Sequence, residues 1–315
     1  METCRLNAVD LFCGCGGLSL GLMNAGIDVL ASWDKWHPAV ETYRMNFDHP
    51  CHEEDLSDPQ VQDRIAEMHP DLIAGGPPCQ DFSIAGARDE TRGRAVLTYS
   101  FRDIILKAKP KWFIMENVPR IAQSAIFADI KRSFRDAGYG LNERVMRAEY
   151  NGVPQKRRRM FLIGRQGAQD GFLNEILERN ETAEPATPRS VWGEEVMGYE
   201  VYFIYPVMKT HKAVFTIDEP TITITGHSTR PIPASYAGNR NNAVDARTPG
   251  LHVTQVRDCA LFQTFPLDFQ IYGGKQDATQ QMGNAVPVKL AEAIGKAVME
   301  YEALESKAKS IEAFC

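Results

Sequence analysis

The sequence has 315 residues, a formal net charge of −6, 43% hydrophobic residues and 24% charged residues. This composition is that of an ordinary globular protein, and neither a run of about 18 apolar residues nor a signal-like N-terminus points to a membrane or to secretion. We therefore expect a cytoplasmic protein without a membrane partner. Its seven scattered cysteines favour free thiols, and Cys13 and Cys15 lack the second close pair that a zinc site requires, so we expect no metal.

Short apolar runs alternate with amphipathic stretches over the first 165 residues. The predicted strands are 7–12, 28–32, 71–74, 112–115 and 160–164, and the predicted helices include 98–107 and 127–137. This alternation is typical of βαβ units. We predict an α/β fold with a doubly wound, mostly parallel sheet.

A glycine-rich turn, DLFCGCGGLSLGL from Asp10 to Leu22, follows the first predicted strand and runs into a helix. Such a turn lets the backbone approach a ligand, and the helix N-terminus offers free N–H groups. Asp34 closes the next strand, where an acid can hold ribose hydroxyls, and Asp55 is placed to accept from an adenine amino group. Without a Walker-type lysine a triphosphate is disfavoured. A methyl-donor nucleoside fits better than a dinucleotide, although the spacing does not separate the two.

The stretch GGPPCQDFS, Gly75 to Ser83, follows the apolar run PDLIA. Gly-Gly-Pro-Pro neither continues a strand nor starts an ordinary helix turn, so Cys79 is expected on a loop at a strand end. Open α/β sheets hold their chemistry at such ends.

Two further polar groups accompany this thiol. Glu116 to Val118 follows the predicted strand WFIM directly, and QKRRR spans Gln155 to Arg159. A thiol, a carboxylate and a fork of arginines could together hold a flat, polar, electrophilic ring. Each also has an ordinary interpretation: an inert loop cysteine, an acid at a helix N-terminus and a solvated basic face.

The composition of the sequence changes at about Gln166. From there Pro, Thr, Asn and Gly become frequent, and runs such as TITIT suggest irregular β structure. Between Val201 and Arg257 there are six basic residues and three acidic residues. In a protein that is acidic as a whole, this small basic excess is a weak indication of nucleic-acid binding. A final amphipathic helix, starting with VPVKLAEAIG, is expected to return to the first domain. We predict one domain from 1–165 with 275–315, and a second, smaller, β-rich domain from 166–274.

Taken together and in this order, these stretches resemble the DNA cytosine-5 methyltransferases, in the compact bacterial form associated with restriction and modification and found in bacteria or phage. DLFCGCGG, GGPPCQDFS, KPKWFIMENV, QKRRRMFLIG, RDCALFQTFP and MGNAVPV match the family's motifs over nearly the whole chain. The resemblance implies a Rossmann-like catalytic domain and a target recognition domain. It also implies transfer of a methyl group from S-adenosylmethionine to carbon 5 of a cytosine flipped out of double-stranded DNA, with S-adenosylhomocysteine as product.

The resemblance assigns catalytic roles residue by residue. Cys79 would attack carbon 6 of the cytosine as a thiolate, and Gln80 belongs to the same motif. Glu116 would hydrogen-bond ring nitrogen 3 and the exocyclic amine, and Arg159 would hold the ring carbonyl. Arg157 would brace the nucleophile loop.

The resemblance also assigns residues to the methyl donor. The positions carried over are Phe12, Gly14 and Gly16 near its amino acid part, Asp34 at the ribose, Asp55 at the adenine, and Leu97, Asn284 and Ala285 lining the pocket. The family usually has glutamate in place of Asp34. A large apolar residue often follows that acid, whereas here Lys35 follows and Trp36 is the candidate substitute, and Leu261 stands where arginine is common.

For the DNA, residues 81–95 are interpreted as a loop that closes over the duplex, with Ser83 and Arg88 contacting phosphates. The second domain resembles the part of the family that varies with the sequence read. Within it Arg230, Arg240 and Asn242 are the candidate base contacts. No recognition sequence follows from them.

Two alternatives remain from the sequence: a transfer RNA cytosine-5 methyltransferase, and a catalytically silent homologue that binds DNA or a partner. The sizeable region after Gln166 and the plain PPCQDFS favour DNA, and the intact Cys79, Glu116 and Arg159 argue against a silent protein. Members of the family usually act as monomers. A restriction endonuclease for the same site would be a partner without a stable complex.

Overall fold

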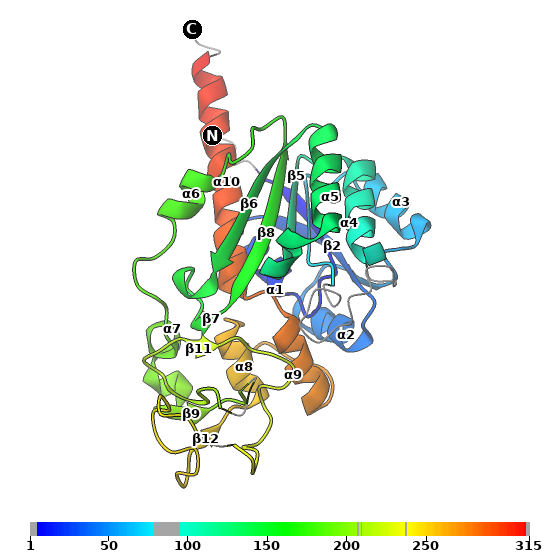
Figure 1. The fold of residues 1–315 in the computed structure, drawn as a ribbon. Helices are drawn as coiled ribbons and strands as arrows, with labels where there is room; N and C mark the ends of the chain where they lie inside the picture. Colours follow the sequence, from blue (N-terminus) through cyan, green and yellow to red (C-terminus); the bar gives the residue numbers. More distant parts are fainter. Residues whose placement is uncertain (1–4, 79–94, 207, 209, 237, 313–315) are drawn as a thin grey trace. The chain divides into compact units, whose positions relative to one another are not determined.

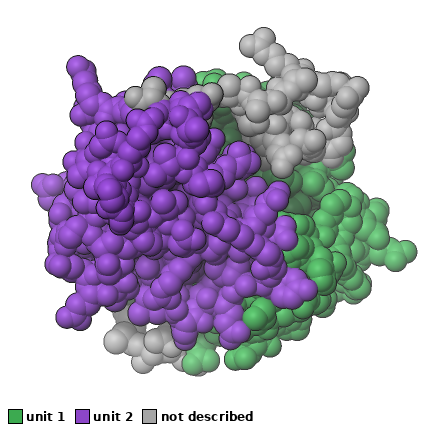
Figure 2. Space-filling view, turned by 90° about the horizontal axis from the view of Figure 1, so that it is seen from below, with its two compact units in different colours: residues 1–146, 158–181, 291–315 green, residues 147–157, 182–290 purple. Residues whose placement is uncertain are grey.

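The computed structural model describes residues 5–78, 95–206, 208, 210–236 and 238–312 (Figure 1). The chain divides into two compact units, which Figure 2 colours separately. Unit 1 contains Met1–Met146, Arg158–Glu181 and Ala291–Cys315, and unit 2 contains Arg147–Arg157 and Thr182–Leu290. No helix in the described part of the chain is both long and apolar enough to cross a membrane.

These units divide the chain at other points than the two expected domains. Residues 166–181 belong to unit 1, because their backbone continues to hydrogen-bond there: the N–H of Gln166 donates to Lys111 and that of Gly171 to Leu141. Residues 147–157 and 275–290 belong to unit 2. The assignment of a catalytic and a target recognition role to the expected domains stays a prediction.

Unit 1 is built on a seven-stranded sheet with the order β3-β2-β1-β4-β5-β8-β6. The strands are β1 (Asn7–Leu11), β2 (Asp28–Asp34), β3 (Cys51–Glu53), β4 (Leu72–Gly75), β5 (Trp112–Asn117), β6 (Tyr139–Arg147) and β8 (Arg158–Gln166). The pairs among β1 to β5 are parallel, and β8 runs antiparallel to β5. This confirms the predicted α/β fold with a mostly parallel sheet; the strands β3 and β6 were not among those predicted.

The helices of unit 1 cover both faces of this sheet. They are α1 (Gly17–Asn24), α2 (His37–Asn46), α3 (Pro59–Glu67), α4 (Ala95–Ala108), α5 (Ala125–Asp136), α6 (Asn174–Arg179) and most of α10 (Val288–Glu312). Neighbouring side chains of a strand point to opposite faces. On β5, Phe113 packs with residues of α4 and α5, whereas Trp112 faces α10.

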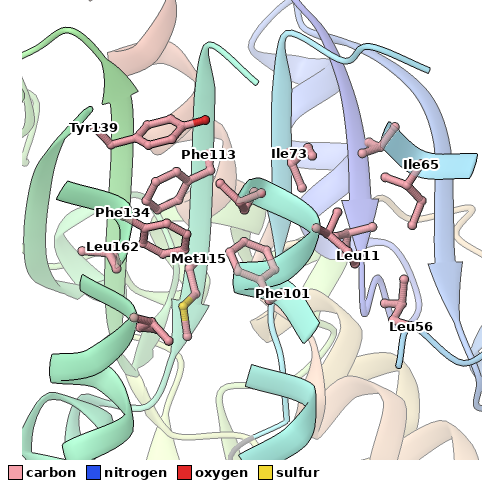
Figure 3. Packing of buried hydrophobic residues seen from close by; sticks show 14 of the residues in the cluster. Leu11, Leu56, Ile65, Ile73, Phe101, Phe113, Met115, Phe134, Tyr139 and Leu162 are labelled. Atoms are coloured by element: carbon pink, nitrogen blue, oxygen red, sulfur yellow. The ribbon is translucent and has the colours of Figure 1, made fainter. Parts of the chain in front are cut away.

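On the face of the sheet covered by α4 and α5, the core is the cluster in Figure 3, where aromatic side chains gather around β5. The ring centroids of Phe113 and Phe134 lie 4.3 Å apart, and Tyr139 packs edge-on against Phe113. Gly164 lies directly opposite Phe113 on β8, and a side chain at Gly164 would overlap the phenyl ring. Glycine at this strand position is therefore required by the packing of Phe113.

The closing helix α10 is tied to the other face by a buried acid. Oε1 of Glu302 accepts from Nε1 of Trp112 at 2.9 Å and from Nε of Arg165 at 3.2 Å, and Oε2 pairs with Lys111. Glu302 is buried, so these partners compensate for its lost hydration. As expected from the sequence, the helix belongs with the first part of the chain.

Unit 2 has short strands and little regular structure. Its three-stranded sheet has the order β10-β9-β12, and β11 pairs with β7. The strands are β7 (Gln155–Lys156), β9 (Val201–Phe203), β10 (Val214–Thr216), β11 (Thr221–Ile222) and β12 (His252–Val253), and the helices are α7 (Pro188–Met197), α8 (Val256–Phe262) and α9 (Lys275–Asn284). This agrees with the irregular β structure expected from the run TITIT.

Candidate active site

The ends of β4 and β5 lie side by side and carry two of the predicted catalytic stretches. The strands pair in parallel with Gly75 beside Met115, so Gly76, directly after β4, lies at the same edge as Glu116, the fifth residue of β5. A Cβ built on Gly76 would lie 3.1 Å from Oε2 of Glu116. The missing side chain at Gly76 therefore lets the backbone that leads to the nucleophile loop approach the carboxylate.

Glu116 forms an ion pair with Arg159, the second residue of β8. Nε of Arg159 lies 2.8 Å from Oε1 of Glu116, and the two side chains are only 15% and 12% exposed. The antiparallel register sets Glu116 opposite Phe161 and Asn117 opposite Met160, which brings the start of β8 to the end of β5. Because water screens this pair poorly, each charge needs the other. The two predicted base contacts thus hold each other in place.

Asn117 is a residue of this edge to which the sequence analysis gave no role. Its Nδ2 donates to the carbonyl oxygen of Pro77 at 3.0 Å, and its Oδ1 accepts from the N–H of Val118 at 2.8 Å. The side chain is buried. Asn117 therefore fastens the Pro-Pro segment to the end of β5. Its position within the stretch Glu-Asn-Val was the sequence signal that could have indicated this role.

Four of the predicted residues lie outside the described residues: Cys79, Gln80, Ser83 and Arg88. Cys79 follows Pro78, the last described residue after β4. The site is therefore described up to the residue before the predicted nucleophile.

The glycine-rich stretch between β1 and α1 is a tight loop with left-handed backbone at Phe12 (φ 57°), Gly14 (φ 54°) and Gly16 (φ 93°). A Cβ on Gly16 would overlap the ring of Phe47, whereas a Cβ on Gly14 would meet no atom within 4 Å. Gly16 is therefore required by the protein's own packing. Of these two glycines, Gly14 is the one that borders open space.

Asp34, at the end of β2, holds this loop in shape. Its Oδ2 accepts from the N–H of Gly14 at 2.9 Å, and its Oδ1 accepts from the N–H of Trp36 at 2.8 Å. Burial raises the pKa of the Asp34 carboxyl, against the opposing effect of these N–H groups. The carboxylate thus builds the loop, and a ribose contact would come in addition.

Lys35 pairs with Asp55 on the surface of unit 1. Nζ of Lys35 lies 3.0 Å from Oδ2 of Asp55, and both side chains are well exposed. Oδ1 of Asp55 accepts from the N–H and the hydroxyl of Ser57, and these bonds, with Lys35, lower the pKa of Asp55 to about 2. Asp55 is therefore ionised at neutral pH. Trp36, the next candidate, is half-buried at the start of α2.

The remaining predicted donor residues are distributed over both units. Leu97 is half-buried in the first turn of α4, in unit 1. In unit 2, Asn284 ends α9 and is exposed, with its Oδ1 accepting from Nε2 of Gln280 at 2.7 Å. Ala285 follows it and is buried.

Arg157 lies at the end of the first segment of unit 2 and is fully buried. Its guanidinium donates to the carbonyl oxygens of Ile224, Gly283 and Ala285. The nucleophile loop that it is predicted to brace begins at Cys79, outside the described residues.

The candidate DNA contacts in unit 2 differ in whether their side chains are exposed or engaged in hydrogen bonds within the protein. Arg230 and Arg240 are exposed, with the guanidinium of Arg230 5.7 Å from the ring of Tyr205. Arg240 lines a hollow of about 500 Å³. Oδ1 of Asn242 instead accepts from the N–H groups of Ala213 and Val214, so the side chain stabilises its own unit. These bonds argue against a base contact by Asn242.

Comparisons with known proteins agree with this arrangement. The family model of the C-5 cytosine-specific DNA methylases matches residues 6–212 and 199–300. The Type II methyltransferase M.HindV of Haemophilus influenzae is 43% identical over 303 residues, covering 94% of this chain and 97% of that protein. The Type II methyltransferase M.HgiDI of Herpetosiphon aurantiacus is 42% identical over 297 residues, covering 94% and 95%.

Solved structures with low sequence identity share the fold. The Dnmt2 methyltransferase of S. pombe has a TM-score of 0.72 at 16% identity, covering 96% of this chain and 99% of that one. A putative DNA modification methyltransferase from an E. coli prophage has a TM-score of 0.66 at 22% identity, covering 95% and 99%. The fold, the family model and the relatives lead to one conclusion: this chain belongs to the C-5 cytosine-specific DNA methylase family and is a DNA cytosine-5 methyltransferase.

Proposed function

We propose that this methyltransferase modifies one cytosine of a specific short duplex sequence through a covalent bond from Cys79 to carbon 6 of the flipped-out base. The observation that carries the proposal is the buried pair of Glu116 and Arg159 beside Gly76, three residues before Cys79. A thiol and this pair would then reach the same ring. The reaction class requires both a nucleophile and groups that stabilise the charge it creates.

Glu116 and Arg159 would divide the polar edge of the cytosine between them. The Glu116 carboxylate would take up a proton from water as the base binds, donate it in a hydrogen bond to nitrogen 3 and accept a hydrogen bond from the exocyclic amine, so that the negative charge of the attacked ring is neutralised at that nitrogen. The Arg159 guanidinium would donate to the ring carbonyl. Their ion pair at 2.8 Å supports this role, because it orients both groups before the base arrives.

The loop after β1 fits S-adenosylmethionine as the methyl donor. The open space beside Gly14, the uncapped N-terminus of α1 and the carboxylate of Asp34 suit a ligand with an amino acid part and a ribose. When bound, this donor supplies an electrophilic methyl group, and S-adenosylhomocysteine is left. We assign its contacts to Phe12, Gly14, Gly16, Asp34, Lys35, Trp36, Asp55, Leu97, Asn284 and Ala285. Because Lys35 pairs with Asp55, an adenine amine would compete with or displace that lysine.

Unit 2 would read the DNA sequence. The exposed Arg230 and Arg240 can donate to base edges or phosphates, as arginine commonly does. Relatives named Type II methyltransferases support a place in a restriction-modification system. There the protein would act as a monomer that protects the sites of a restriction endonuclease.

The test is bisulfite sequencing of DNA from a methylation-free host that expresses this chain, with Cys79→Ser as the matched control. We expect methylated cytosines in one recurrent short sequence, and none in the control. The covalent step is tested separately with duplex DNA that carries 5-fluorocytosine at that site, which should form an adduct that survives denaturation. An unmethylated genome with folded protein present would contradict the proposal, and methylation of transfer RNA in the same cells would replace it.

A further inference from the structure

A buried cation links three separate stretches of unit 2. Nη1 of Arg157 donates to the carbonyl oxygen of Ile224 at 3.0 Å, and Nη2 donates to those of Gly283 and Ala285 at 2.9 and 3.0 Å. The side chain is fully buried. A buried cation is retained only where its partners compensate for the lost hydration. These three acceptors are main-chain oxygens, so the guanidinium fixes the backbone at Ile224, Gly283 and Ala285.

Two buried glutamines extend this arrangement. Nε2 of Gln263 donates to the carbonyl oxygens of Met282 and Ala285, and its Oε1 accepts from Nε2 of Gln155 at 2.9 Å. Oε1 of Gln155 accepts from the N–H of Ile224 at 2.8 Å. The side chains therefore form a connected network around the end of α9, and such networks are strongest when every member is satisfied.

The network acts where α9 ends. The last carbonyl groups of a helix have no partner within it and carry its negative partial charge, which a cation stabilises. Arg157 and Gln263 together supply donors to Met282, Gly283 and Ala285. On the other side, a Cβ on Gly283 would clash with the backbone of Thr225. The turn from Gly283 to Ala285 is thus held from two sides.

We propose that Arg157 is a positioning residue for the methyl donor. It fixes the turn that carries Asn284 and Ala285, so its loss loosens donor binding instead of slowing attack by the nucleophile. The inference rests on the proposed assignment of these two residues to the donor pocket. It gives Arg157 a different task from bracing the nucleophile loop.

The test compares Arg157→Lys with Arg158→Lys, an exposed neighbour outside the network. Lysine keeps the charge but lacks the planar fork that reaches three carbonyls. For Arg157→Lys we expect the Kd of S-adenosylhomocysteine, measured calorimetrically without DNA, and the donor KM to rise about tenfold or more. At saturating donor kcat should stay within about threefold of the wild-type value, because the reacting groups are unchanged. Arg158→Lys should match the wild type in all three.

Two results separate failure of this inference from failure of the proposed function. If the wild-type protein does not bind S-adenosylhomocysteine, the proposed donor pocket itself is wrong. Normal donor binding by Arg157→Lys, or a fall in kcat with unchanged donor KM, would overturn the positioning role alone.

A second variant covers the case in which Arg157→Lys does not fold. Gln263→Leu removes the donor to the carbonyl oxygens of Met282 and Ala285 at the same turn while Arg157 stays in place. The same rise in donor KM with nearly constant kcat is expected, because Gln263 has no assigned contact with the donor or the base. An unchanged donor KM in folded Gln263→Leu, with or without a lower kcat, would contradict the proposal.

Discussion

The ion pair between Glu116 and Arg159 gives the most quantitative prediction for the candidate site. At 2.8 Å and an effective dielectric constant of about 20, two unit charges attract by roughly 6 kcal/mol, and the cost of taking both charges out of water cancels much of this. Removing one partner takes the counter-charge away from the other, still buried charge, which costs about 3 to 5 kcal/mol. We expect Arg159→Leu or Glu116→Leu to lower the free energy of unfolding of unit 1 by that amount.

The double variant separates the interaction energy of the pair from the interactions that each residue makes with the rest of the protein. With both residues changed to Leu no charge is left unpaired, so the loss should be smaller than the sum of the single losses by about 2 kcal/mol or more. Urea unfolding followed by circular dichroism gives these energies. In parallel, Glu116→Gln should slow adduct formation with 5-fluorocytosine DNA by about a hundredfold or more, as for loss of a charge-stabilising group. Additive losses in the double variant would refute the idea that the two residues hold each other in place.

Three further predictions concern the neighbouring residues. Asn117→Ala should lower the free energy of unfolding by about 1 to 3 kcal/mol and slow adduct formation, because a buried carbonyl loses its donor; unchanged adduct kinetics would exclude a positioning role. Gly16→Ala should weaken binding of S-adenosylhomocysteine far more than Gly26→Ala, which has a similar φ but no clash like that with Phe47; equal effects would show that backbone strain alone matters. Burial raises the pKa of Asp10 to about 7, from 3.8, so the folded state keeps a proton that the unfolded state loses. The contribution of Asp10 to stability should therefore be fully present below about pH 4 and fall towards pH 7, by at most about 1.4 kcal/mol per pH unit, and urea unfolding of Asp10→Asn should lack this part of the slope.

The sequence predicted the central strands of the sheet. Apolar runs bounded by glycine and proline located β1, β4 and β5, and the residues proposed for the site stand at or directly after the ends of these runs. Two strands of the seven-stranded sheet were missed for local reasons. β3 has only three residues, and β6 carries polar residues such as Asn142 and Arg144 within its pattern, so neither resembles a buried apolar run.

The individual side chains were harder to predict because their partners lie far away in the sequence. Arg157 and Arg159 are two residues apart, yet one is buried among backbone carbonyls and the other pairs with Glu116. Asn242 looks like a polar loop residue, but its amide supports the backbone at Ala213. Such partners depend on tertiary contacts that neither composition nor periodicity contains.

If unit 2 reads the DNA sequence as proposed, the division into units has a consequence for exchanging target specificities between relatives. The chain passes between the units after residues 146, 157, 181 and 290. Most of unit 2 is therefore one continuous insert, 182–290, which a single gene segment could supply. Its short first segment, 147–157, contributes Gln155 and Arg157 to the network that holds the end of α9. A chimera would thus have to keep donor and acceptor matched across that network, and grafts that begin at residue 182 should work best between relatives that share both residues.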